Sequence, residues 1–189
     1  TNRSQYFKQP LKVCSYMVFI SRFHLFNIFI FQKKKLLMEY ISTRNNLDHF
    51  SFKSVFLKGL ADDGGLFVPK SFKSYSKEEL NKLSNLSYND LATEIIFPFI
   101  GDFMKKEKLS SIISKSYSNF RSENVVKISN LGDLKVLELF HGPTLAFKDI
   151  AMQLIGNFYQ FHLTHEQKKI NIIVATSGDT GAAAIDALK

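Results

Sequence analysis

The sequence contains almost no cysteine and no tryptophan. Cys14 is the single cysteine among 189 residues, so no disulfide can form within the chain, as is usual for proteins of a reducing compartment. We therefore expect a cytoplasmic protein, and we expect no metal site. Hydrophobic residues make up 45% of the chain and charged residues 22%, which are the proportions of a globular protein that buries a core.

Acidic residues are absent from residues 1–37, and this absence accounts for the basic character of the whole chain. The segment holds seven positive charges, which are Arg3, Lys8, Lys12, Arg22, Lys33, Lys34 and Lys35. The net charge of the chain is +8, so residues 38–189 carry only +1. A nearly neutral body has no electrostatic footprint for nucleic acid, and we expect no nucleic-acid partner.

Residues 1–37 also lack an uninterrupted apolar run long enough to cross a membrane. Arg22 lies inside the apolar stretch of residues 13–32, and no small-residue cleavage site follows that stretch. We interpret residues 1–37 as an upstream extension that is not part of the fold, with Met38 as the expected first residue. A weak membrane anchor held by Lys33–Lys35 and a targeting peptide are the alternatives.

Residues 38–120 are expected to form a mostly helical N-terminal domain. The apolar spacing within residues 51–60 predicts an amphipathic helix, and the turn signal "ADDGG" follows it. "SKEEL" and "SYND" each place a serine three residues before an acidic residue, as at the start of a helix. Pro98 is expected to bend or end the second of these helices. Residues 104–118 are expected to form another helix.

Residues 121–189 are expected to begin an α/β domain. The pattern predicts a strand at 134–140, a helix at 149–163, a strand at 170–176 and a helix from 182 onward. This order implies a parallel sheet, whose ligands bind where the strands end. The loops "HGPT" and "SGDTG" follow the two strands and should therefore face one crevice. We expect the chain to be the front piece of a longer protein and to be inactive alone.

The loop "TSGDTG" (residues 176–181) has the composition of an anion-binding turn. Gly178 and Gly181 permit tight turns and the close approach of a ligand, and Ser177 and Thr180 supply hydroxyl groups. The first backbone N–H groups of the next helix are unpaired and favour a carboxylate or phosphate. Asp179 would repel such an anion, unless it accepts a hydrogen bond from a cofactor or points outward.

The pattern places Lys148 between an expected buried strand and an expected helix, in "HGPTLAFKD" (residues 141–149). Desolvation at such a place can make a lysine neutral and nucleophilic toward an aldehyde, with which it forms a Schiff base. Asp149 either opposes this by favouring the charged amine or simply suits the start of the helix. Together with the anion-binding loop, Lys148 is the strongest candidate for a catalytic residue.

"HGPTLAFKD" and "ATSGDTG" resemble the threonine synthase family, pyridoxal-phosphate enzymes of fold type II. "MEYISTRN" (38–45) and "GLADDGGLFVP" (59–69) resemble the N-terminal segment of the same family. The resemblance implies that pyridoxal 5'-phosphate is bound to Lys148, which also acts as the catalytic base. It further implies a substrate-carboxylate loop that approaches the pyridoxal 3-oxygen, formed by Ser177, Gly178, Asp179 and Thr180, with His141 and Thr144 lining the same pocket.

The implied reaction converts O-phospho-L-homoserine and water to L-threonine and phosphate, so the expected partner is this small-molecule substrate. A threonine-synthase-like lyase that removes phosphate from a related amino-acid phosphate is the alternative enzyme. A different class of function, a non-catalytic binding module anchored to a membrane by residues 11–35, is also left open by the sequence.

Overall fold

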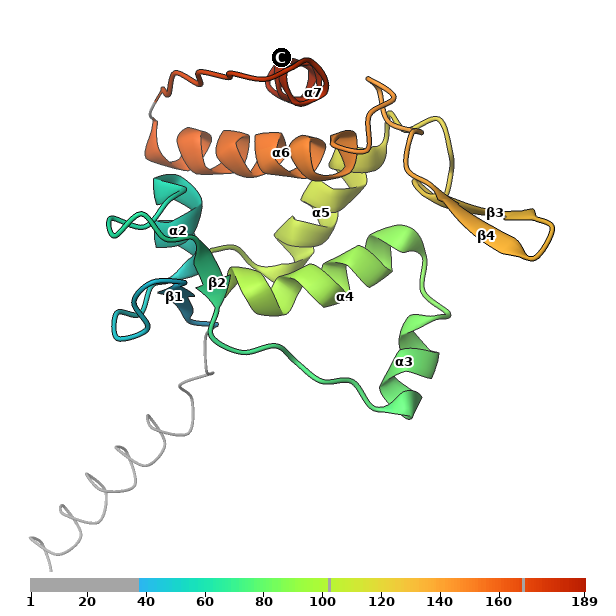
Figure 1. Ribbon diagram of the computed structural model, residues 1–189, viewed down its shortest axis with the longest axis horizontal. Coiled ribbons are helices and arrows are strands. Elements are labelled where there is room, and N and C mark those ends of the chain that lie inside the picture. Colours follow the sequence, from blue (N-terminus) through green and yellow to red (C-terminus); the bar gives the residue numbers. More distant parts are fainter. Residues whose placement is uncertain (1–37, 102, 168) are drawn as a thin grey trace, which may run out of the picture. The chain divides into compact units, whose positions relative to one another are not determined.

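The computed structural model describes residues 38–101, 103–167 and 169–189 (Figure 1). The predicted extension and the possible anchor in residues 1–37 lie outside these residues. The described elements are, in chain order, β1 (Tyr40–Ser42), α2 (Phe52–Lys58), β2 (Phe67–Pro69), α3 (Lys77–Leu83), α4 (Tyr88–Ile100), α5 (Lys106–Tyr117), β3 (Lys127–Leu131), β4 (Leu134–Glu138), α6 (Asp149–Glu166) and α7 (Asp179–Ala187). In the described part of the chain, no helix is long and apolar enough to span a bilayer.

The hydrophobic core lies where α4, α5 and α6 meet. Leu109 and Ile113 of α5 are fully buried, and Ile100 at the end of α4 is 1% exposed. Phe158 of α6 joins the same cluster, and Phe52 of α2 packs edge-on against it, with the ring centroids 6.1 Å apart. The core thereby fixes α6, the helix that begins next to the candidate lysine.

Helix starts are positioned by the serine motifs that the sequence predicts. The Ser76 hydroxyl oxygen accepts a hydrogen bond from the Glu79 N–H, and the Glu79 carboxylate accepts one from the Ser76 N–H, a complete capping box. The Ser87 hydroxyl oxygen likewise accepts from the Asp90 N–H at the start of α4. Pro98 lies inside α4, which ends two residues later at Ile100. The predicted helix at 104–118 is present as α5.

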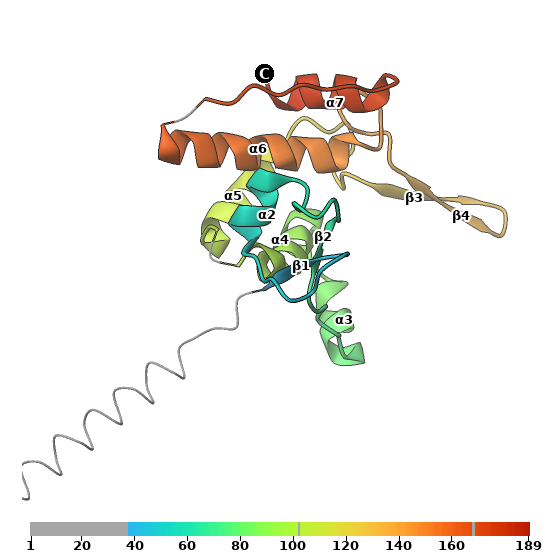
Figure 2. The same cartoon turned by 60° about the vertical axis from the view of Figure 1, so that its left-hand side comes forward.

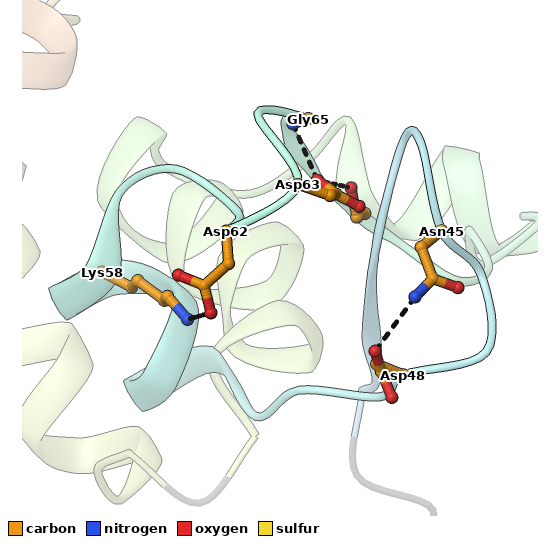
Figure 3. Close-up of polar contacts among 7 residues, drawn as sticks. Asn45, Asp48, Lys58, Asp62, Asp63 and Gly65 are labelled. Atoms are coloured by element: carbon orange, nitrogen blue, oxygen red, sulfur yellow. Dashed lines mark hydrogen bonds and ion pairs between the residues drawn. The ribbon is translucent and has the colours of Figure 1, made fainter.

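Strands β1 and β2 form an antiparallel pair whose connection ends in a turn centred on Asp63. The Asp63 carboxylate accepts hydrogen bonds from the Gly65 N–H and from the Ser42 hydroxyl, both at 2.8 Å (Figure 3). Gly64 has φ 76°, in the left-handed region that glycine adopts most readily. A Cβ on Gly65 would lie 2.2 Å from the Ser42 hydroxyl oxygen. The "DGG" sequence is therefore required by the geometry of this turn.

We expect the Asp63→Asn variant to lose less stability in acid than the unmodified protein does. The hydrogen bonds from Gly65 and then from Ser42 lower the pKa of Asp63 from its usual 3.8. A lowered folded-state pKa gives stability that is present above the unfolded-state value and is lost as the pH falls through the folded-state value. The unfolding midpoint in urea should therefore fall less steeply below about pH 4 in the variant than in the unmodified protein.

The control for this measurement is Asp62→Asn. The Asp62 side chain is 86% exposed and pairs with Lys58 at 2.5 Å (Figure 3), and it takes no part in the turn. If Asp62→Asn reduces the acid-induced fall of the unfolding midpoint as much as Asp63→Asn does, the hydrogen bonds of Asp63 are not the cause of that fall.

The predicted parallel pairing of the strand at 134–140 is wrong. Its counterpart β4 pairs antiparallel with β3, with Ser129 opposite Val136, and the two strands form a hairpin (Figure 1). Gly132 has φ 59° in the short connection between them, as tight hairpin turns require. Residues 170–176, expected as the second strand, have no strand partner among the described residues. The helices that flank them are both present, as α6 and α7.

Candidate functional site

The segment between β4 and α6 is folded by the carboxylate of Asp149. Asp149 is the first residue of α6 and is 0% exposed. One carboxylate oxygen accepts a hydrogen bond from the Thr144 N–H at 2.8 Å, and the other accepts one from the Thr144 hydroxyl at 2.7 Å. A Cβ on Gly142 would lie 2.4 Å from the Asp149 side chain. Only glycine therefore fits at residue 142 while Asp149 holds this position.

The backbone between Gly142 and Asp149 makes two successive turns. The Leu145 N–H donates to the Gly142 carbonyl at 3.2 Å, and the Asp149 N–H donates to the Ala146 carbonyl at 3.0 Å. Leu145 has φ 67°, an uncommon value for a residue with a side chain and a mark of local strain. The hydrogen bonds from Thr144 to Asp149 connect the first turn to the end of the second.

Lys148 is the residue immediately before α6 and occupies its N-cap position. Its side chain is half-buried, and its ammonium nitrogen lies 4.2 Å from the centroid of the Phe147 ring. Among the described residues no carboxylate pairs with this nitrogen. Both carboxylate oxygens of the neighbouring Asp149 accept hydrogen bonds from Thr144 instead. Of the two roles that the sequence left open for Asp149, the structure therefore shows the one at the start of the helix.

His141 is held by a carboxylate that sequence reasoning missed. Its Nε2 lies 2.8 Å from Oε2 of Glu138, and the other oxygen of Glu138 accepts a hydrogen bond from the Ser129 hydroxyl. The hydrogen bond from Ser129, followed by that from His141, lowers the pKa of Glu138. The His141 carbonyl also accepts from the Arg121 N–H at 2.8 Å. The imidazole orientation is therefore set by the β3–β4 hairpin.

The predicted start of the last helix at residue 182 is wrong, because α7 begins at Asp179. Gly178 is its N-cap residue with φ 149°, and the Gly178 N–H donates to the Thr176 hydroxyl oxygen at 3.3 Å. Asp179 and Thr180 therefore lie in the first turn of the helix, where an acidic side chain suits the helix dipole. In this turn three residues are exposed, which are Ser177, Gly178 and Asp179, and Thr180 is half-buried.

The two candidate loops belong to helices that pack on each other. The Gln153 amide of α6 donates to the Asp186 carboxylate of α7 at 2.9 Å. Both views show α7 next to α6, and in Figure 1 α7 is seen end-on where it crosses α6 (Figures 1 and 2). Within the described residues, no hydrogen bond or ion pair joins residues 141–149 to residues 176–181. The shared crevice for the two loops therefore stays a prediction.

Comparison with known proteins agrees with this architecture. Residues 39–117 match the family described as "Threonine synthase N terminus". Threonine synthase of Pseudomonas aeruginosa is 41% identical over 150 residues, which are 79% of this chain and 32% of that protein. The human protein "Threonine synthase-like 2" is 39% identical over 154 residues, which cover 80% of this chain and 32% of that protein.

A solved structure gives the same result for the fold. A crystal structure described as pyridoxal-phosphate-bound threonine synthase from Brucella melitensis matches with a TM-score of 0.76 at 38% identity, covering 80% of this chain and 33% of that one. This likeness confirms the expected α/β class, the N-terminal part of fold type II. The chain spans about a third of the length of these relatives. By sequence and by fold, the chain is similar to the N-terminal portion of threonine synthases.

Proposed function

We propose that the full-length gene product is a threonine synthase that converts O-phospho-L-homoserine and water to L-threonine and phosphate. The observation that carries this proposal is Lys148, a half-buried lysine at the start of α6 whose amine forms no ion pair in the described part of the chain. A lysine of this kind is suited to bind an aldehyde cofactor. The relatives that share this segment are about three times as long as this chain, and they are named threonine synthases.

The residues present fit pyridoxal 5'-phosphate. Its aldehyde requires a primary amine that is not neutralised by a carboxylate, and Lys148 meets this requirement because Asp149 is directed to Thr144. When bound, the cofactor supplies an electron sink for carbanions at the substrate. Lys148 would hold the cofactor, and its free amine would then move protons at the α and β carbons of the substrate.

The first turn of α7 is proposed to bind the carboxylate of the substrate. Its backbone N–H groups have no partner within the helix and favour an anion, and Ser177 and Thr180 add hydroxyl groups next to them. Asp179 would approach the pyridoxal 3-oxygen. His141 would line the same pocket with the edge of its ring that faces away from Glu138.

The division of the chain is also a proposal. Residues 1–37 would be an upstream extension, residues 38–120 the mostly helical N-terminal domain, and residues 121–189 the start of the cofactor-binding α/β domain. Lys70 pairs with Glu39 at 3.1 Å, which supports the inclusion of the first residues after Met38 in the fold. The cytoplasmic location remains a prediction.

The test is an assay of the full-length gene product with pyridoxal 5'-phosphate and O-phospho-L-homoserine. Two versions of the protein are compared, one beginning at Thr1 and the other at Met38. We expect phosphate and threonine to appear in equal amounts, at equal rates for both starts, and no threonine from residues 1–189 alone. Phosphate release without threonine would favour the threonine-synthase-like lyase. If neither product forms and the protein sediments with membranes, the enzyme proposal is wrong.

A further inference from the structure

Asp149 is a fully buried carboxylate that has no basic partner among the described residues. Burying a carboxylate costs much free energy unless hydrogen bonds replace the lost water. Here both replacements come from one residue, because Thr144 supplies its N–H at 2.8 Å and its hydroxyl at 2.7 Å. We refer to these two hydrogen bonds as the Thr144–Asp149 clamp.

The clamp accounts for the separation of two neighbouring opposite charges. Lys148 and Asp149 are adjacent in sequence, yet the ammonium nitrogen of Lys148 lies over the Phe147 ring at 4.2 Å. The Asp149 carboxylate instead points to Thr144, on the side where Gly142 leaves room for it. Because Asp149 is adjacent to Lys148 in sequence, a rotated Asp149 side chain could place its carboxylate near the amine.

We propose that Thr144 and Asp149 are positioning residues for Lys148, and that the clamp both closes the turn before α6 and keeps the Asp149 carboxylate away from the Lys148 amine. This inference rests on the proposed role of Lys148. It also changes the expected role of Thr144, because its N–H and its hydroxyl proton are already used by Asp149. Thr144 therefore acts through the turn rather than by donating to the substrate.

The test compares Thr144→Val with Thr144→Ser in the full-length gene product. Valine keeps the shape of the side chain and removes the hydroxyl donor, so one oxygen of a buried carboxylate loses its partner. We expect the dissociation constant for pyridoxal 5'-phosphate, measured by absorbance titration of the apoprotein, to rise about tenfold. The kcat should fall while the KM for O-phospho-L-homoserine changes little. Thr144→Ser should restore both values to within about twofold of the unmodified protein, because the donor returns.

Thr93→Val is the matched control. Thr93 is 5% exposed, and its hydroxyl donates to the Asn89 carbonyl at 2.8 Å inside α4, so this variant also removes a buried threonine hydroxyl. It should lower the melting temperature without changing cofactor affinity. If Thr144→Val binds the cofactor as tightly as the unmodified protein does, or if Thr93→Val weakens binding equally, the positioning role is wrong.

Two further measurements keep the inference testable. Should Thr144→Val not fold, Asp149→Asn replaces it: this variant keeps the shape of the side chain, presents an amide to the Thr144 donors, and should weaken cofactor binding in the same direction. Borohydride reduction of the unmodified holoprotein separates the two proposals. A pyridoxyl mass on Lys148 together with unchanged clamp variants refutes the clamp alone, whereas its absence from Lys148 refutes the proposed function and with it the clamp.

Discussion

Replacement of Lys148 by arginine should abolish covalent attachment of pyridoxal 5'-phosphate in the full-length gene product. An imine to the cofactor aldehyde needs a primary amine that can lose its proton, and the guanidinium group of arginine stays protonated. The half-buried aliphatic stem and the cation over the Phe147 ring would both be preserved, so the fold should be largely kept. Loss of a group that moves protons should lower kcat by about 10²–10⁴-fold.

Borohydride reduction followed by peptide mass analysis measures this effect directly. Reduction converts the imine between lysine and the cofactor to a stable secondary amine, so a peptide containing residue 148 of the unmodified protein should carry the pyridoxyl mass. The same peptide should be unlabelled in Lys148→Arg and in Lys148→Ala. Lys127 and Lys135, both exposed on the β3–β4 hairpin, are internal controls. A label on either of them, or on a lysine elsewhere in the full-length protein, would falsify the assignment.

The helices of the N-terminal part were predictable because their signals are local. A serine and an acidic residue three positions apart interact within one turn of helix, and the structure confirms this at Ser76 and Glu79 and at Ser87 and Asp90. The start of α7 lies three residues before the predicted start at residue 182. Its first turn contains Gly181, which weakens a helical pattern, but the methyl group of Thr176 packs against this glycine and leaves no room for a side chain.

The strand pairing could not be deduced from the apolar pattern alone. A strand is defined by its hydrogen bonds to a partner that lies elsewhere in the sequence, and the apolar residues of 134–140 fit either direction of pairing. The hairpin does have a local signal, since Gly132 and Asp133 lie between two short runs containing apolar residues. The alternation of strand and helix that follows favours a parallel sheet and so conflicts with this turn signal.

The candidate site divides in the same way. The sequence alone proposes Lys148 and Gly142 as parts of the site, and their roles stay predictions, whereas the carboxylate that supports His141 has no such signal. Ser129 lies across the hairpin from Val136, so its side chain is on the same face as that of Glu138, two residues further along. This contact depends on the register of β3 against β4, which the sequence does not specify by any local pattern.

Gly156→Ala should lower the stability of the protein, against the usual effect of this substitution. Replacing glycine by alanine inside a helix ordinarily stabilises it by about 0.5–1 kcal/mol. Gly156 is buried in α6 where α7 crosses it, and a Cβ there would lie 2.3 Å from the carbonyl oxygen of Ala187. Because that atom belongs to the backbone, α7 must move as a whole, and overpacking of this kind costs about 1–3 kcal/mol.

The stability change of Gly156→Ala is measured by urea unfolding, and its location is measured by amide hydrogen exchange. Exchange should accelerate in α7, including the first turn with Asp179 and Thr180, more than in α5. Ala151→Gly, at an exposed position of α6, calibrates the helix-propensity difference between the two residues, because no packing change accompanies it. If Gly156→Ala raises the unfolding midpoint by the amount that Ala151→Gly lowers it, then α7 does not press on α6 at this glycine. The proposed carboxylate-binding turn at the start of α7 would then lack the rigid support that the helix packing gives it.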